Sequence, residues 1–307
     1  MTPSEAPEDV IPVIVDPTAI PGQGVPHLNR SEPDTPRGKR PRKFRAIDIL
    51  GPLAVFGIFI GLWYLIAYNT DNNFSPATGK PLLIPAPHQL FWGVGDVSGK
   101  IAHATLLSAE TALLGLAIAI VLGVGVAVLM SQTPWIERSL WPYLIALQAV
   151  PILALVPLLI NFFGANFRTR VIVTVIICFF PIVSNTLFGL LSADRTQHDL
   201  FTLSHASRRT RLTKLQLPSA LPAMFAGFRI SAGLSVIGAI VGDFFFTKGS
   251  PGLGRLISDY FINNQPSRMF VCSILASLLG VLFFVVFGWL SNRAVGHWHE
   301  SVRKDSR

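Results

Sequence analysis

The sequence predicts an all-α membrane protein with six membrane-spanning helices, and three observations support this fold class. Of the 307 residues, 50% are apolar and only 14% are charged, whereas soluble domains carry about 25% charged residues. Six apolar segments are long enough to cross a hydrocarbon layer of about 30 Å as helices. Cationic residues gather on one side of the resulting topology, which is typical of the cytoplasmic side of a membrane protein.

The six predicted spans alternate with short connections. They cover residues 47–68, 104–130, 139–163, 169–191, 222–246 and 269–293. An even number of crossings places both termini on one side, and the arginine-rich connection between the fourth and fifth spans lies on that side too. The positive-inside rule makes this side cytoplasmic. Arg168 and Arg170, which fall in an opposite loop, run mildly against the rule.

Residues outside the spans form two predicted tails. The segment 1–46 begins with a stretch rich in proline and acidic residues, a composition typical of disorder. It ends in a basic cluster between Arg37 and Arg45 that directly precedes the first span. This cluster could bind nucleic acid or anchor the chain to anionic lipid, and its position beside a span favours lipid. The membrane domain is predicted over 47–293, and a cytoplasmic tail over 294–307.

Polar side chains inside the spans are the candidates for a translocation path. A charged group at the bilayer centre costs at least ~2.5–3.5 kcal/mol, so such residues are seldom placed there without a partner. The four candidates are Gln148, Asn185, Arg229 and Asp243. Hydrogen bonding between helices is the alternative role for each. Counting the helical rise from Pro222 places Asp243 near the outer surface.

Prolines and small residues give the spans a predicted internal geometry. Pro151, Pro157 and Pro181 lack backbone donors and should kink the third and fourth spans. Small residues recur every fourth position from Gly115 to Ala127, and a second stripe runs from Gly227 to Gly242. Such stripes allow close helix packing, either as a fixed contact or as a surface that moves during transport.

Motifs for catalysis, phosphate binding or metal binding are absent from the sequence. Gly79-Lys80 is followed by proline and lacks the upstream glycine of a phosphate loop. Cys178 and Cys272 lie in apolar runs and are expected to act as small hydrophobic residues. We therefore predict no cofactor, no metal and no enzyme activity, and ATP-driven transport would need ATP binding by another chain.

A short amphipathic helix is predicted in the outer connection between the fifth and sixth spans. Gly249, Pro251 and Gly252 form a turn. Apolar residues then follow at helical spacing from Leu253 to Phe261. This helix is expected to lie on the outer surface or to cap a pore mouth.

The connection between the fourth and fifth spans carries a recognisable motif. It resembles the EAA loop of binding-protein-dependent ABC importer permeases, with Asp199 at the Glu position, Leu200 and Phe201 at the Ala positions, and His205 at the Gly position. The motif ends in Leu215-Gln216-Leu217-Pro218. The residues assigned to an ATPase-coupling loop are Asp199, Leu200, Phe201, Leu203, His205, Ala206, Ser207, Arg208, Leu217 and Pro218.

Further segments resemble the nitrate, sulfonate and taurine branch of this family. They are Ile84-Pro85-Ala86-Pro87, Leu147-Gln148-Ala149-Val150-Pro151, Phe179-Phe180-Pro181 with Asn185, and Ala226-Gly227-Phe228-Arg229. The resemblance extends over about 47–293 and implies a type I importer bundle. It also implies partners: cytoplasmic ATPase subunits, an extracytoplasmic solute-binding protein, and a second permease in a homodimer or heterodimer within the lipid bilayer.

Substrate and energy source leave alternatives. The branch favours a small anion such as nitrate, a sulfonate or taurine, while relatives with similar motifs move thiamine-precursor pyrimidines or flavins. A secondary transporter driven by an ion gradient is the alternative class. It would be expected to carry inverted repeats or acidic residues near the midplane. The predicted spans show neither, since Asp243 is expected toward the outer edge.

Overall fold

The computed structural model describes residues 46–71, 84–90 and 94–295. The predicted N-terminal tail, except Ala46, lies outside these residues, as does the C-terminal tail from residue 296. The helices are α1 (Ala46–Asp71), η2 (Pro87–Leu90), η3 (Gly95–Val97), α2 (Ser98–Gln132), α3 (Pro134–Ala149), α4 (Ile152–Phe163), α5 (Phe167–Leu191), α6 (Arg195–Leu203), α7 (Arg208–Arg211), η4 (Leu212–Gln216), α8 (Leu217–Phe244), α9 (Leu253–Ile262) and α10 (Pro266–Val295). The predicted all-α class is confirmed for this part of the chain.

Membrane-spanning length is reached by five helical segments of the described chain. These are Leu50–Asn69, Gly95–Gln132, Phe167–Leu191, Arg208–Phe244 and Pro266–Ala294. The third predicted span, 139–163, is two helices, α3 and α4, which meet at an angle of 95°. Counted as one broken span, this pair brings the total to six.

The break between α3 and α4 follows from one proline. Val150 is extended, with φ −67° and ψ 125°, because the ring of a following proline disfavours helical geometry at the preceding residue. Pro151 then stands at the N-cap of α4. By contrast, α4 continues through Pro157 and α5 through Pro181 without a break, so the predicted kink is a break only at Pro151.

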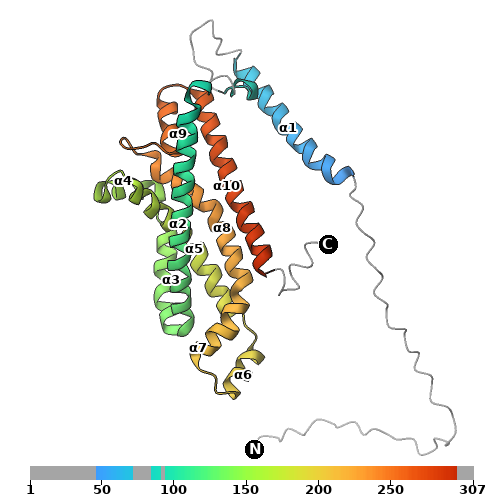
Figure 1. The fold of residues 1–307 in the computed structure, drawn as a ribbon, viewed down its shortest axis with the longest axis vertical. Coiled ribbons are helices and arrows are strands. Elements are labelled where there is room, and N and C mark those ends of the chain that lie inside the picture. The colour runs from blue at the N-terminus through green and yellow to red at the C-terminus, as the bar shows by residue number, and fades with distance from the viewer. Residues whose placement is uncertain (1–45, 72–83, 91–93, 296–307) are drawn as a thin grey trace, which may run out of the picture. The chain divides into compact units, whose positions relative to one another are not determined.

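The core is built around α5, which packs most extensively against α8 and α2 (Figure 1). Small residues permit this approach: a Cβ atom at Gly115 of α2 would lie 2.5 Å from Thr174, and one at Gly238 of α8 would lie 2.7 Å from the Cα of that same residue. Cys178 donates to the carbonyl of Ser231 at 3.3 Å, and the Ser231 hydroxyl donates to the carbonyl of Cys178 at 3.2 Å. Both predicted small-residue stripes therefore lie in helix contacts.

The amphipathic helix predicted after the fifth span is α9. Its residues Leu253, Leu256 and Tyr260 are buried, and they cluster with Ile101 of α2 and Cys272 of α10. Phe261 remains exposed. Because α8 leads from the α6–α7 connection at its start to α9 at its end (Figure 1), these two elements occupy opposite ends of one helix.

Most large apolar side chains of α1 are exposed. Its C-terminal half is held by aromatic contacts: the Trp63 indole donates to the carbonyl of Pro85 at 3.1 Å and its ring lies 6.0 Å from that of Phe270. Tyr64 stacks on His88 with ring centroids 5.8 Å apart. The remaining apolar surface is suited to contact with lipid or protein rather than water.

Candidate functional site

The predicted coupling loop is a pair of short helices with their own caps. Asp194 accepts from the amide of Thr196 at the start of α6, and Ser207 accepts from the amide of Thr210 at the start of α7. A guanidinium nitrogen of Arg211 donates to the Thr202 hydroxyl at 3.0 Å, which ties α7 to α6. These bonds satisfy polar groups at the helix termini within the loop itself.

The C-terminal end of α6 forms a Schellman motif with His205 in the left-handed region. The φ of His205 is 50°. Its amide bonds the carbonyl of Thr202, and the amide of Ala206 bonds that of Phe201, both at 3.0 Å. This pattern of bonds calls for a left-handed residue at C′, where glycine is usual. The geometry therefore explains why the family pattern has Gly at this position, and His205 adopts the same conformation.

Two apolar side chains of α6, Leu200 and Leu203, are exposed. Leu200 is 63% exposed and Leu203 is 80% exposed. They lie three residues apart and so share one face of the helix. Asp199, Ser207 and Arg208 are also exposed, whereas Phe201 and Ala206 are half-buried.

The coupling loop enters α8 through a π-helix. In η4 the amide of Leu217 bonds the carbonyl of Leu212, five residues back. Pro218 follows directly, and in a regular helix its ring would clash with the carbonyl of Lys214. The wider π turn relieves that clash, and π-helical turns are often found at functional sites. Leu217 and Pro218 therefore mark the junction between the loop and the span.

The four path candidates do not form one cluster. Gln148 is exposed near the end of α3, beside the break at Pro151. Asn185 of α5 is half-buried, bonds the carbonyl of Pro181 at 2.8 Å and packs against Gly227 of α8. Arg229, two residues beyond Gly227, is exposed. The structure therefore brings Asn185 and Arg229 to one level of the bundle.

Arg229 is supported by α10. Its guanidinium lies 4.1 Å from the centroid of the Phe284 ring. A Cβ atom at Gly288 would lie 3.0 Å from the Arg229 Nε, so the small residue leaves room for the side chain. A cation stacked on an aromatic ring at an exposed site is attracted by about 0.5–1 kcal/mol. This contact orients the charge while leaving it accessible in the single chain.

Asp243 lies about 21 Å along α8 from Arg229, given a rise of about 1.5 Å per residue. It forms an ion pair with Arg170 of α5 at 2.9 Å, and the two side chains are 1% and 5% exposed. Ala239, one turn earlier, packs with Leu279 near the middle of α10. Asp243 is thus buried at the C-terminal end of α8, one residue before the helix ends, against the first turn of α5.

Arg170 is a residue whose role sequence reasoning missed. It was assigned to an outer loop, but it lies in the first turn of α5, where it is buried. Pairing with Asp243 explains why it departs from the positive-inside rule. The available signal was the opposite charge of Asp243 near the end of the fifth span. The sequence could not show that Arg170 and Asp243 are close, because their contact is tertiary.

Glu110 is a second residue that sequence reasoning missed. It is the one charged residue in the predicted span 104–130. It lies in α2, exposed in the single chain. Ionisable residues inside a span are candidates for function by default, so its position within the apolar run was the signal that could have found it.

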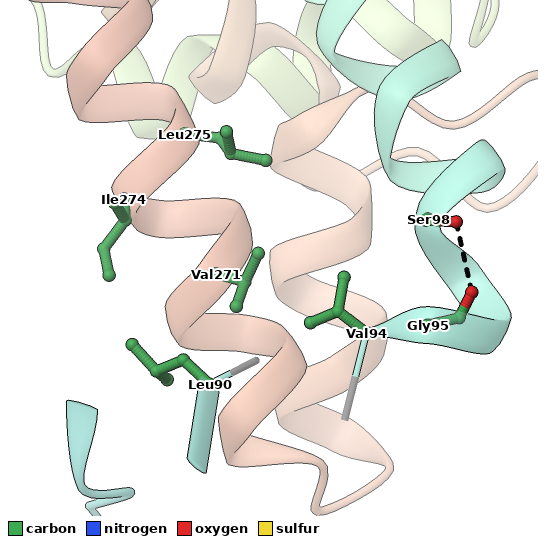
Figure 2. A pocket seen from close by; sticks show the side chains of 7 residues that line it. All are labelled: Leu90, Val94, Gly95, Ser98, Val271, Ile274 and Leu275. Carbon is green, nitrogen blue, oxygen red and sulfur yellow. Dashed lines mark hydrogen bonds between the residues drawn. The ribbon is translucent and has the colours of Figure 1, made fainter. Parts of the chain in front are cut away.

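An apolar groove of about 420 Å³ lies beside the N-terminal part of α10 (Figure 2). Its apolar lining includes Leu90, Val94, Val271 and Ile274. The hydroxyl of Ser98 is already used, since it donates to the carbonyl of Gly95 at 3.1 Å (Figure 2). Among the residues that the structure describes, Ser98 is the one polar side chain of this lining. In the part of the chain that the structure describes, no group of His, Cys, Asp or Glu side chains could hold a metal ion.

Comparisons with known proteins identify the family. Residues 119–296 match the family described as binding-protein-dependent transport system inner membrane component. The formylaminopyrimidine transport permease protein ThiX of Halalkalibacterium halodurans is 34% identical over 250 residues, 81% of this chain and 96% of ThiX. The nitrate import permease protein NrtB of Leptolyngbya laminosa is 27% identical over 256 residues, 80% of this chain and 87% of NrtB.

A solved structure agrees with the fold. The MetNI methionine ABC transporter in an inward-facing conformation includes a chain with a TM-score of 0.58 at 17% identity. The match covers 66% of this chain and 98% of that chain. Together with the family match, the fold shows that this chain belongs to the binding-protein-dependent inner membrane components and is a permease subunit of an ABC importer.

Proposed function

We propose that this chain forms the translocation path of an importer and couples that path to separate cytoplasmic ATPase subunits through α6. The observation that carries the proposal is the exposed pair Leu200 and Leu203 on a helix whose backbone is capped locally. Burying each leucine in a partner would contribute about 1.5–3 kcal/mol. A self-contained helix that presents apolar side chains is suited to docking into a groove.

The other partners follow from the family. A solute-binding protein would deliver substrate on the outer side, and a second permease copy would complete the path. Both termini would face the cytoplasm, as expected from the distribution of arginines. Protease protection or reporter fusions at Met1 and Arg307 test the topology, and an outward-facing terminus would overturn it.

The path would include Gln148, Asn185 and Arg229. Asn185 and Arg229 lie at one level on neighbouring helices, and Arg229 is the exposed cation. Asp243 was predicted to line the path too, but its burial and its pairing with Arg170 favour a positioning role. Closure of the two ATPase subunits on ATP would move α6, and this movement would switch the bundle between outward-open and inward-open states.

Two substrate classes remain candidates. A pyrimidine related to thiamine precursors is supported by the ThiX match, which spans 96% of that relative. A small anion is supported by the NrtB match and by the exposed guanidinium of Arg229, which could bind an anion. Uptake of labelled nitrate and of labelled formylaminopyrimidine into vesicles that hold the full transporter would separate the two.

The coupling proposal is tested by co-purification with the ATPase. Leu203→Asp would place an unpaired charge in the interface, so ATPase binding should be lost while the permease inserts normally. Thr202→Asp is the matched control: it adds the same charge on α6 at a position whose side chain already accepts from Arg211. Retained binding by Leu203→Asp would exclude α6 as the coupling element.

A further inference from the structure

We infer that the buried Arg170–Asp243 pair is a positioning device that makes α5, α8, α9 and the turn Phe245–Gly252 move as one body during transport. The inference rests on the proposed coupling through α6. It assigns Asp243 and Arg170 to transmission of the movement, and neither residue needs to touch the substrate.

The first step is that this pair is poorly explained as a stabilising contact alone. The two charged groups lie 2.9 Å apart, and both side chains are at least 95% buried. Replacing a buried ion pair by well-packed apolar residues is often neutral or stabilising, because desolvation offsets the attraction. A pair kept in this interior is therefore expected to do something that apolar residues could not.

The second step is what the charges hold. Arg170 donates to the carbonyl of Ser250 at 2.6 Å, and its guanidinium lies 4.8 Å from the ring of buried Phe246. The second carboxylate oxygen of Asp243 accepts from the amide of Arg255 at 3.1 Å. The pair thus connects α5 and α8 to the backbone of the turn and to the first turn of α9.

The third step concerns the start of α9, which lacks a side-chain cap of its own. Free amides at a helix N-terminus need acceptors, and a carboxylate there is favoured by the helix dipole. Asp243 supplies one acceptor, and the hydroxyl of Ser108 in α2 accepts from the amide of Leu253 at 2.9 Å. The start of α9 is therefore capped by two other helices.

The fourth step is the lack of space between these groups. A Cβ atom at Gly252 would lie 2.5 Å from Asp243 Oδ2 and 2.9 Å from the Ser108 hydroxyl oxygen. The start of α9 therefore lies directly against the capping groups. The turn is held from the other side as well, since Arg255 donates to the carbonyls of Gly249 and Thr247 at 2.8 and 2.9 Å.

The last step connects this assembly to the coupling loop. α8 is one unbroken helix from Leu217 to Phe244. Asp243 stands about 39 Å from Leu217, given the helical rise of about 1.5 Å per residue. A displacement of α6 that moves the start of α8 would reach Asp243 through this helix. The ion pair would then carry α9 and the outer turn along with it.

The test uses the complete transporter, with its ATPase subunits and solute-binding protein, in proteoliposomes. Asp243→Asn keeps the shape of the side chain but removes its charge, so uptake should fall at least tenfold while ATP hydrolysis stays within twofold. Hydrogen exchange of the amides of Leu253 and Arg255 should accelerate. Asp243→Glu should recover part of the uptake. The double variant Arg170→Asp with Asp243→Arg should show more uptake than either of its two single substitutions.

Ser108→Ala provides a milder variant in case Asp243→Asn does not assemble. It removes the acceptor of the Leu253 amide and should lower the ratio of uptake to ATP hydrolysis about threefold. Equal losses of uptake and hydrolysis in these variants, or unchanged exchange in α9, would overturn the inference. Failure of the proposed coupling through α6 would look different, because Leu203→Asp would then still bind the ATPase.

Discussion

The helices at the two ends of α8 satisfy the polar backbone groups of their termini in opposite ways. At its start, polar backbone groups of the coupling loop are satisfied by nearby caps, and the apolar side chains Leu200 and Leu203 are left exposed. At its end, Asp243 of α8, which is paired with Arg170 of α5, and Ser108 of α2 cap a third helix, α9. Gly252 allows these groups to approach closely, because a Cβ atom there would lie 2.5 Å from Asp243. Caps supplied within the loop leave its surface available to a partner, whereas caps supplied by other helices join helices of the same chain.

The largest effect, on the stability of the fold, is expected from adding a side chain at the close contact between α5 and α8. Gly238→Val would place its Cβ 2.7 Å from the Cα of Thr174, and backbone cannot yield as a flexible side chain can. Overpacking should destabilise the fold by about 3 kcal/mol, the upper end of its usual range, because the clash is with backbone. Thermal unfolding of the detergent-solubilised permease measures this. Gly233→Val, where a Cβ meets nothing within 4 Å, is the control and should unfold near the unmodified midpoint; similar midpoints would show that the contact is not tight.

A large effect on binding, with little on stability, is expected at the exposed end. Leu200→Ala and Leu203→Ala should each weaken ATPase binding by roughly tenfold or more, because burial of a leucine contributes about 1.5–3 kcal/mol. Their melting midpoints should not change. Titration of purified ATPase against permease in nanodiscs gives the affinity. Half-buried Phe201 is the comparison, since its truncation should lower stability as well. Unchanged affinity for both leucine variants would remove the docking role of this end.

An intermediate effect is expected between the ends, at the level of Asn185 and Arg229. Each change to Ala should lower uptake about tenfold while leaving ATPase binding intact, because the polar groups are needed in the path. Arg229→Lys keeps the charge but loses the planar stacking on Phe284. Recovery of uptake by Lys would show that charge matters more than stacking. Full uptake by both alanine variants would return the two residues to structural packing.

The smallest effect is expected at His205. His205→Gly removes the penalty for a side chain at φ 50°, which should stabilise the end of α6 by about 1 kcal/mol. Hydrogen exchange at the amides of His205 and Ala206 should slow accordingly. His205→Val is the opposite variant, since a β-branched residue tolerates this conformation poorly. Faster exchange in the glycine variant would contradict the assigned Schellman geometry.

Much of the site could be predicted because its signals are local. The coupling loop could be located from its EAA-like motif, and in the structure α6 of this loop presents Leu200 and Leu203 on its surface. Amphipathic spacing likewise predicted α9. The assigned coupling and path roles stay predictions. The path candidates could be named from polarity inside spans, but their grouping could not, because Asn185 meets Gly227 only through the packing of α5 on α8.

The sequence by itself determined the membrane class, the helical content and the family, since hydropathy, charge and short motifs act over neighbouring residues. Tertiary structure decided what the ionisable residues do. Arg170 and Asp243 lie far apart in the chain. Taken alone, Arg170 departs from the positive-inside rule, and Asp243 is a charged residue inside a predicted span. In the structure both side chains are buried, and their charged groups form an ion pair at 2.9 Å. The physical reason is that the cost of a buried charge depends on its partner, and partners are set by how helices pack.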